Sequence, residues 1–348
     1  MKILFEHGMP FHLAHGGYQI QIEQTKRGLE EAGAEVEWLR WWDDSQTGDV
    51  IQAFSPITAA VPYHAKEKQI PVVLMTLLSG LCDQSPFRLR LKALQDLLFK
   101  RLPGIRGSFG TLPQQLFHLC THNLVNIHAE ARMLEQIYHV PDDRISVVPG
   151  GLSEDFLNAK PATKEGDYLI STATITERKN SVELARLAKL AEVPILFVGK
   201  PYHPSLDYWQ RFKEMIDGRW VQYREHVSDA GELIALLRSA RGFVIKSHTE
   251  TWCFSAHEAA ACGLPVLLPD QKWSREIFGD QASYFTASDA ANVAILQNYY
   301  TQAANAPAPK IRFWSWKEVG EQHLLIYKRL MNLPSNVPAP GPVLLGPN

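Results

Sequence analysis

Residues 246–269, KSHTETWCFSAHEAAACGLPVLLP, decide the predicted fold. The apolar run 242–245 before them predicts a buried strand, and the alanine-rich residues 255–262 predict a helix that Gly263 closes at its C-terminal end. Residues 264–268 then predict a second strand. The stretch is therefore predicted to be a strand–helix–strand unit of a parallel sheet.

This unit carries two carboxylates eight positions apart, Glu250 in the loop and Glu258 about one turn into the helix. Ligands of such units collect outside the carboxyl ends of the strands, near the free N–H groups of the helix N-terminus. The space between the carboxylates suits a ligand with hydroxyls at both ends and negative charge in the middle, as in a nucleotide sugar. The spacing alone also fits an exposed loop carboxylate and a helix carboxylate that merely interacts with the helix dipole.

The composition limits the classes of protein. A chain of 348 residues exceeds the usual size of one α/β domain, so two domains are expected. A net charge of −2 gives no overall attraction to nucleic acid. The four cysteines show no CxxC pair, which favours reduced thiols in a cytoplasmic protein. Residues 1–5 are too short an apolar run for a signal peptide or a membrane span, and they predict a first strand.

Strand-like and helix-like segments alternate along the chain, which indicates an α/β fold with parallel sheets covered by helices. A first series of predicted elements has strands at 1–6, 35–39, 50–54, 71–75, 124–127 and 145–148, with helices at 18–32 and 129–138. A second series has strands at 168–172 and 194–198 and helices at 181–191, 208–216 and 231–239, followed by the unit described above. Each series predicts one Rossmann-like domain.

The domain boundaries follow from a change in composition. Residues 150–167 have the Gly, Pro and charged content of a linker, so the domains are predicted at 1–155 and 156–312. A last helix is predicted within 313–331, with Ser315 as N-cap and Glu318 at its third position. Residues 332–348 are rich in Pro and Gly and are predicted to be disordered.

Taken in order, six motifs resemble the retaining family 4 glycosyltransferases of the GT-B fold, from residue 2 to about residue 331. The motifs are Gly16-Gly17, RISVVPGGL at 144–152, ERKN at 177–180, FVGKP at 197–201, the opening stretch, and SREIFGD at 274–280. The resemblance implies two Rossmann-like domains that face each other across a cleft, with the last helix crossing back to the first domain. It also implies a cytoplasmic enzyme of polysaccharide biosynthesis whose first domain binds the acceptor and whose second binds a nucleotide sugar.

The resemblance implies roles for individual residues. Glu250 would contact the donor sugar hydroxyls and Glu258 the ribose hydroxyls, because an ionised carboxylate accepts hydrogen bonds from a vicinal diol. Lys179 would reach the diphosphate, and Glu250 and Lys179 are the candidate catalytic residues. The remaining implied contacts are the backbone near Trp252, Cys253 and Phe254 with the diphosphate, the loop of His226 and Val227 with the nucleobase, and Gly16 and Gly17 with a phosphate or the acceptor.

The chain departs from the family pattern in the second domain. Ala173 and Thr174 stand where the family has a Gly-Arg pair, so one cation for the diphosphate is missing, and Arg178 is the hypothetical replacement. Cys253 stands where the family has glycine, which we expect to be tolerated only with a negative φ.

A further departure concerns the first domain. The family often has a histidine after the strand at 71–75, and this chain has residues 76–80, TLLSG, there instead. With Leu77 in this segment, the polar group that the family histidine supplies on the catalytic side is in doubt. The candidate substitutes are His12, His15 and His128, each of which could equally be structural or bind the acceptor.

The predicted function is transfer of a hexosyl unit, with retention, from a nucleotide-diphosphate sugar to a hydroxyl acceptor such as a glycan, a lipid-linked sugar or a small molecule. The chain has no Asp-x-Asp signature, so neither a metal nor another cofactor is expected, and cations with helix N-termini would stabilise the leaving diphosphate. The alternatives are a degenerate GT-B protein that binds sugar nucleotide or glycan without turnover, and a sugar-nucleotide epimerase or phosphorylase.

Residues 88–106 combine six cations with a leucine-rich stripe. Such a segment could lie on the anionic inner face of a membrane beside a lipid-linked acceptor. The same pattern also fits a helix that packs its leucines on its own core. Peripheral membrane contact and simple packing both remain open at this point.

Overall fold

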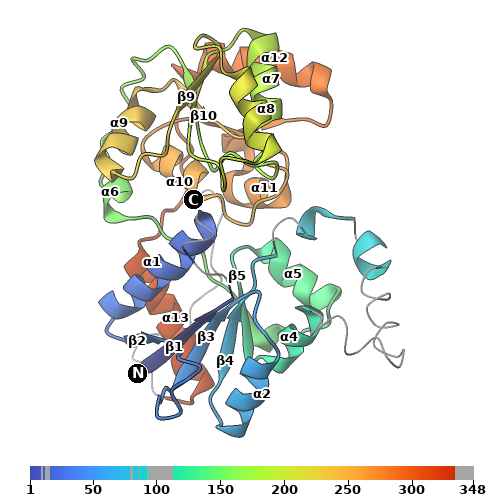
Figure 1. Ribbon diagram of the computed structural model, residues 1–348, viewed down its shortest axis with the longest axis vertical. Helices are drawn as coiled ribbons and strands as arrows, with labels where there is room; N and C mark the ends of the chain where they lie inside the picture. The colour runs from blue at the N-terminus through green and yellow to red at the C-terminus, as the bar shows by residue number, and fades with distance from the viewer. Residues whose placement is uncertain are drawn as a thin grey trace. The chain divides into compact units, whose positions relative to one another are not determined.

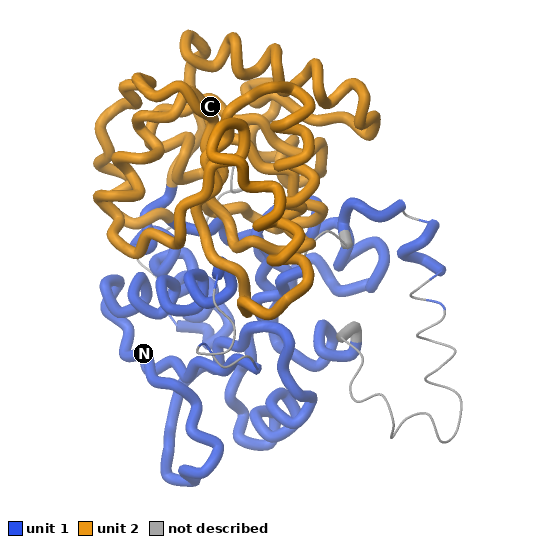
Figure 2. Tube along the Cα trace, turned by 45° about the horizontal axis from the view of Figure 1, so that its top comes forward, with its two compact units in different colours: residues 1–151, 314–344 blue, residues 152–313, 345–348 orange. Residues whose placement is uncertain are grey.

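The computed structural model describes residues 1–8, 11, 16–78, 81–85, 87–91, 94 and 113–333. The chain divides into two compact units, which Figure 2 shows in separate colours. Unit 1 contains Met1–Gly151 and the helix that follows Trp314, and unit 2 contains Leu152–Phe313. Most of the predicted disordered tail, from residue 334 on, lies outside the described residues.

Unit 1 is built on a six-stranded parallel sheet with the order β2-β1-β3-β4-β5-β6. Its strands are β1 (Lys2–His7), β2 (Glu35–Trp38), β3 (Val50–Phe54), β4 (Val72–Met75), β5 (His122–Val125) and β6 (Ile145–Val147). Its helices include α1 (Gly17–Glu31), α2 (Ala60–Glu67), α4 (Pro113–Leu119), α5 (His128–Gln136) and α13 (Trp316–Leu330). Helices α1 and α13 cover one side of the sheet, and α2, α4 and α5 cover the other (Figure 1).

The last helix packs directly on the first. At Gly28 an added Cβ would lie 2.0 Å from the Trp316 carbonyl oxygen, so only glycine permits this close approach of α1 to α13. The predicted start of α13 is confirmed by a capping box. The Ser315 hydroxyl accepts a hydrogen bond from the Glu318 N–H (3.1 Å), and the Ser315 N–H donates to the Glu318 carboxylate (2.7 Å).

Unit 2 contains the second six-stranded parallel sheet, with the order β12-β11-β10-β7-β8-β9. Its strands are β7 (Leu169–Thr172), β8 (Ile195–Val198), β9 (Val221–Arg224), β10 (Gly242–Val244), β11 (Val266–Pro269) and β12 (Ser283–Phe285). Its helices are α6 (Glu154–Leu157), α7 (Ser181–Ala191), α8 (Asp207–Met215), α9 (Ala230–Ser239), α10 (Phe254–Ala261), α11 (Lys272–Phe278) and α12 (Asp289–Ala303). Figure 1 shows α7, α8 and α12 on one side of this sheet and α6, α9 and α10 on the other.

Some predicted segments differ from the structure. Strand β5 begins two residues before the predicted position, at His122, and its first two side chains are polar and buried, each with one hydrogen-bonded polar atom. His122 Nε2 pairs with the Ser146 hydroxyl (2.8 Å), and the Asn123 amide donates to the Phe117 carbonyl (2.9 Å). The predicted linker 150–167 contains the short helix α6, and the sequence reasoning omitted elements including β9, β12 and α12.

Each sheet has one place where the order of the strands reverses. In unit 2 it lies between β7 and β10, because β8 and β9 follow on one side and β11 and β12 on the other. In unit 1 it lies between β1 and β3. The connections that leave these neighbouring strands run to opposite faces of the sheet, and ligands of open α/β sheets bind at the carboxyl ends of such strands.

Candidate functional site

The reversal in the unit 2 sheet brings together three charged residues. Lys179 and Arg178 follow β7, and Glu250 follows β10, so the two connections meet at the carboxyl ends of adjacent strands. The Lys179 ammonium donates a hydrogen bond to Glu250 Oε1, and Arg178 Nη1 donates to Glu250 Oε2 at 3.1 Å. Arg178 Nη1 also donates to the Thr249 carbonyl at 2.9 Å. Glu250 is therefore held between two cations.

Burial strengthens the electrostatic interactions among these three side chains. The Glu250 side chain is buried, and that of Lys179 is only slightly more exposed. Burial by itself raises the pKa of Glu250, but the charges of Lys179 and Arg178 outweigh it and hold the pKa below the ordinary value of 4.5. Glu250 is thus an ionised carboxylate inside unit 2, where its charge depends on both cations.

The second carboxylate lies on α10, as predicted, five positions after the N-cap Cys253. Burial raises the pKa of Glu258 to about 7, against the opposing effect of Lys179. Lys179 therefore interacts electrostatically with both predicted carboxylates. A group that titrates near neutrality at the carboxyl edge of a parallel sheet is characteristic of a functional site.

The expected negative φ at Cys253 is wrong. Cys253 has φ 59° and ψ 72°, which is the left-handed region that glycine adopts without cost. The chain keeps this conformation because the next residues must turn sharply from the loop into α10. The Cys253 carbonyl accepts hydrogen bonds from the Ala256 N–H at 3.0 Å and from His257 Nδ1 at 3.1 Å.

His257 is a site residue that the sequence reasoning missed. Its ring stacks on Trp252, with centroids 4.3 Å apart and planes at 11°, and both side chains are buried. Burial lowers the pKa of His257 to about 4, so the ring is neutral. Trp252 Nε1 and His257 Nε2 have no hydrogen-bond partner among the described residues. Only the spacing of an aromatic residue and a histidine at positions 252 and 257 could have suggested this stack.

The other predicted residues belong to other segments of the two units. His226 is exposed and Val227 buried in the loop after β9, the outermost strand of the unit 2 sheet. Gly16, with φ 122°, is the N-cap of α1 in unit 1, and Gly17 begins that helix. His128 begins α5 in the same unit.

The predictions for the segment after β4 and for its substitute histidines both concern unit 1. The proposed substitutes His12 and His15 lie outside the described residues. Thr76, in the segment with Leu77, is buried and donates from its hydroxyl to the Leu124 carbonyl at 2.9 Å. Thr76 is therefore satisfied within the sheet.

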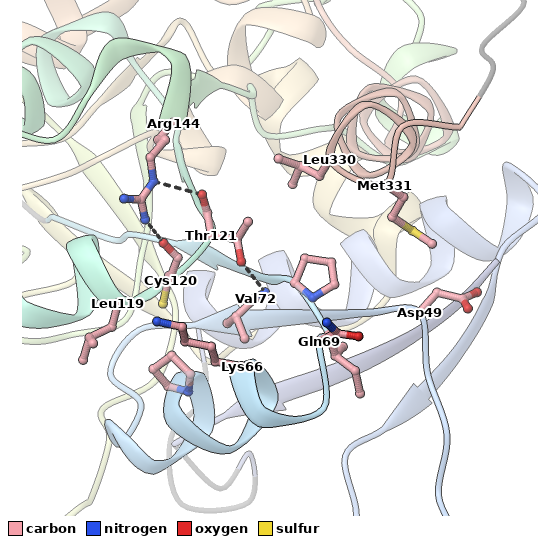
Figure 3. Close-up of a pocket in the computed structure, with 13 residues that line it drawn as sticks. Asp49, Lys66, Gln69, Val72, Leu119, Cys120, Thr121, Arg144, Leu330 and Met331 are labelled. Atoms are coloured by element: carbon pink, nitrogen blue, oxygen red, sulfur yellow. Dashed lines mark hydrogen bonds between the residues drawn. The ribbon is translucent and has the colours of Figure 1, made fainter.

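A pocket of about 580 Å³ lies elsewhere, at the amino ends of the unit 1 strands (Figure 3). Its lining includes Asp49, Val72 and Arg144, which precede or begin β3, β4 and β6. Arg144 Nε donates to the Thr121 carbonyl at 3.1 Å, and its Nη2 donates to the Cys120 carbonyl, so its guanidinium already binds main-chain groups. This edge is opposite to the carboxyl ends where ligands of parallel sheets bind.

In the described part of the chain, no cluster of three or more His, Cys, Asp or Glu side chains is arranged to hold a metal ion. Among the same residues, every helix is too short or too polar to cross a bilayer. The basic stretch 88–106 falls largely outside the described residues, which include only 88–91 and 94 of it.

Known proteins resemble this chain in sequence and in fold. Residues 153–301, most of unit 2, match the family model described as glycosyl transferases group 1. The O-antigen chain mannosyltransferase B of Escherichia coli is 24% identical over 219 residues, and the match covers 56% of this chain and 57% of that protein. The matched stretch thus spans little more than half of the relative's length.

Solved structures share the fold. Sucrose-phosphate synthase from Thermosynechococcus elongatus has a TM-score of 0.67 and 13% identity, with 95% of this chain and 100% of that chain covered. Anabaena HepE, solved in complex with UDP-glucose, has a TM-score of 0.60 and 14% identity, with 95% and 98% covered. The predicted class, two Rossmann-like α/β units of the GT-B type, and the resemblance to glycosyltransferases are confirmed.

Proposed function

We propose that the protein is a retaining glycosyltransferase that moves a hexosyl unit from a nucleotide-diphosphate sugar to a hydroxyl acceptor. The single observation that carries this proposal is the junction of Lys179, Arg178 and Glu250 at the strand reversal of unit 2. The match to the group 1 glycosyl transferase model covers the same unit. The Escherichia coli relative is named as a mannosyltransferase, which makes mannose a reasonable first donor sugar to test.

The charges of the cluster suit a sugar diphosphate. In the free protein, the hydrogen bonds that Lys179 and Arg178 give to Glu250 neutralise one carboxylate. A diphosphate can share these two cations, together with the N–H groups at the start of α10, in the loop of Trp252, Cys253 and Phe254. Glu250 can then accept hydrogen bonds from the sugar hydroxyls instead.

The second carboxylate fits the other end of the donor. Glu258 follows on α10, where it can accept hydrogen bonds from the ribose diol in its ionised form. With a pKa of about 7 it is partly protonated in the free protein, and a bound diol that stabilises the anion lowers this pKa. The nucleobase would lie toward the loop of His226 and Val227.

The proposed reaction requires no covalent bond between the protein and the sugar. Departure of the diphosphate and attack of the acceptor hydroxyl occur on the same face of the sugar, and the leaving phosphate takes up the acceptor proton. The cations Lys179 and Arg178 stabilise the charge that develops on the diphosphate. Arg178 thereby serves in place of the family arginine that Thr174 replaces, and the reaction requires no metal or other cofactor.

A donor screen tests this proposal. Hydrolysis and equilibrium binding are measured with GDP-mannose, UDP-glucose and ADP-glucose for the wild type, Glu258→Ala and Lys179→Met. We expect one donor to be bound and slowly hydrolysed, with its affinity lowered about tenfold to a hundredfold in either variant, because each loses a charge-assisted contact.

Lys189→Met is the matched control, because it removes a cation from the same helix region, where Lys189 pairs only with Asp217 on the surface (3.4 Å). It should bind the donor as the wild type does. Binding without any turnover, even with acceptors present, would support a degenerate sugar-nucleotide-binding protein instead. If no donor binds and Glu258→Ala changes nothing, the enzyme proposal fails.

A further inference from the structure

The strand reversal of unit 1 has a polar group of its own. Glu6 is the penultimate residue of β1 and is almost buried. Its Oε2 accepts a hydrogen bond from Trp41 Nε1 at 3.2 Å, although the two residues are 35 positions apart. Burial raises the pKa of Glu6 to about 7, against the lowering effect of Trp41. A buried carboxyl group whose hydrogen-bond partner among the described residues is a neutral indole is costly to the fold unless it has a role.

Glu6 lies where β1 and β3 end side by side. In the register of the sheet it is opposite Ala53, and Phe54 follows as the last residue of β3. The Tyr18 hydroxyl donates to the Phe54 carbonyl at 3.4 Å, and the charge of Glu6 adds to the effect of burial in raising the pKa of Tyr18. Glu6 and Tyr18 thus converge at the reversal point of the unit 1 sheet, the position at which ligands of such sheets bind.

Two exposed tryptophans follow one another after β2, and the first of them, Trp41, is bonded to this carboxyl group. Trp41 is 58% exposed and Trp42 is 82% exposed, in the loop that follows β2. Because the edge of the Trp41 indole is tied to Glu6, the exposed remainder of its ring lies next to the carboxylate. Large aromatic side chains left in water at the carboxyl end of a sheet mark a binding surface more often than a structural one.

The tryptophan loop is held in one shape by a set of polar contacts. Gln46 accepts a hydrogen bond from the Arg40 N–H (2.8 Å) and donates to the Trp38 carbonyl (3.0 Å). Arg40 bridges two carboxylates, with 2.8 Å to Glu37 and 2.9 Å to Asp43. These bonds tie both sides of the loop, so its main chain is already ordered and loses less freedom when a ligand binds.

The surface continues as an aromatic wall along the end of β1. Trp38 packs edge-on against His7, with ring centroids 5.3 Å apart. His7 in turn stacks on Phe11, with centroids 4.3 Å apart and planes at 7°. The site therefore combines flat apolar faces with one carboxyl group.

We propose that this surface, formed by Glu6, Trp41 and Trp42, binds a pyranose ring of a carbohydrate acceptor. A pyranose has apolar C–H faces that can lie on indole rings and hydroxyls around its edge that can donate to a carboxylate. An aliphatic lipid chain would bury Glu6 without giving it a donor, which is unfavourable. The inference rests on the proposed function in one respect, since it assigns the acceptor of that reaction to the class of glycans.

Saturation-transfer NMR on the full chain tests the inference directly. The probes are methyl α-mannopyranoside, α-1,3-mannobiose, maltose and lactose, each titrated without donor. We expect at least one saccharide to bind the wild type, with an affinity that falls about tenfold in Trp42→Ala through lost stacking. Glu6→Gln should weaken it about tenfold to a hundredfold, because a charge-assisted hydrogen bond is lost.

Tyr63→Ala is the matched control, because Tyr63 is an exposed aromatic residue of the same unit on helix α2. It should bind the saccharide as the wild type does. Thermal unfolding of each variant confirms that the fold is retained, which is expected for Trp42→Ala at so exposed a position. The inference is overturned if no saccharide binds or if Trp42→Ala and Tyr63→Ala behave alike.

The outcomes separate this inference from the proposed function. Saccharide binding that depends on Trp42, without hydrolysis of any nucleotide sugar, would support the glycan site and contradict the transferase proposal. Donor hydrolysis that is unchanged in Trp42→Ala, with no saccharide binding, would support the transferase proposal and contradict the glycan site. If both hold, Trp42→Ala should raise the acceptor KM about tenfold and leave the donor KM unchanged.

Discussion

Lys179 donates a hydrogen bond to the Glu250 carboxylate, although 71 positions separate the two residues. The bond joins the connection that follows β7 to the one that follows β10, at the only reversal of strand order in the unit 2 sheet. The pair lies inside unit 2. Replacing either residue therefore leaves the charge of the other with one ion-pair partner fewer.

Lys179→Met should destabilise unit 2 by about 3 kcal/mol, because it leaves the buried Glu250 with Arg178 as its remaining cation. Lys179→Met/Glu250→Gln should recover much of that loss, since no uncompensated charge then remains. Urea unfolding of the four proteins in the double-mutant cycle gives the coupling energy. Additive effects would contradict a direct ion pair, and Lys189→Met, which loses only a surface pair, should cost less than about 1 kcal/mol.

Position 253 should prefer glycine to alanine. The left-handed conformation there costs an L-residue about 1–2 kcal/mol, whereas glycine adopts it freely. We therefore expect Cys253→Gly to be more stable than Cys253→Ala by about 1 kcal/mol, the reverse of the order in helix interiors. Both variants lack the thiol, so their difference in thermal unfolding isolates the backbone. Equal stability would show that the loop relaxes to a negative φ.

His323 should make the fold less stable in mild acid. It is completely buried on α13, and burial lowers its pKa from 6.5 to about 3. Below pH 6.5 the imidazole of His323 is protonated in the unfolded chain but stays neutral in the folded chain. The free energy of unfolding therefore falls by about 1.4 kcal/mol per pH unit. Between pH 7 and pH 5, His323→Gln should therefore lose about 2 kcal/mol less than the wild type in urea titrations. Parallel pH profiles would contradict a neutral buried imidazole.

Donor turnover should be insensitive to chelators. If Lys179 and Arg178 stabilise the leaving diphosphate, then 5–10 mM EDTA, about the concentration needed to strip weakly held Mg²⁺, should leave the rate unchanged. The rate is measured by nucleotide release with the donor found in the screen. Loss of turnover that Mg²⁺ or Mn²⁺ restores would replace this account with a metal-assisted one.

The basic stretch gives a prediction about membranes. At its described start, Leu89 is buried, whereas Phe87, Leu91 and Leu94 are exposed, so an apolar set faces water beside Arg88 and Arg90. We expect the protein to float with vesicles that contain anionic lipid, and the variant with Arg88, Arg90 and Lys92 changed to Glu to stay in the pellet fraction. Flotation that is equal for both proteins, or absent for both, would contradict a role of this basic segment in membrane binding.

Much of the site could be predicted because it lies in short, local patterns. The strand–helix–strand unit placed Glu250 before α10 and Glu258 within it, and the structure has both in those places. The capping box at Ser315 was likewise evident from spacing, because its hydrogen bonds run between residues three positions apart. The start of β5 was predicted less well, because its first residues are polar and their hydrogen bonds, to Ser146 and Phe117, lie outside the strand itself.

The sequence by itself determined the alternation of strands and helices and hence the α/β class, since hydrophobic periodicity and caps act over a few residues. Only the tertiary structure decided which strands are neighbours. The pairing of β7 with β10, and of β1 with β3, brings Lys179 to Glu250 and Glu6 to the end of β3. Only the structure also shows the left-handed conformation of Cys253, which its residue type disfavours. Contacts across 71 positions depend on packing of the whole unit, which no local spacing encodes.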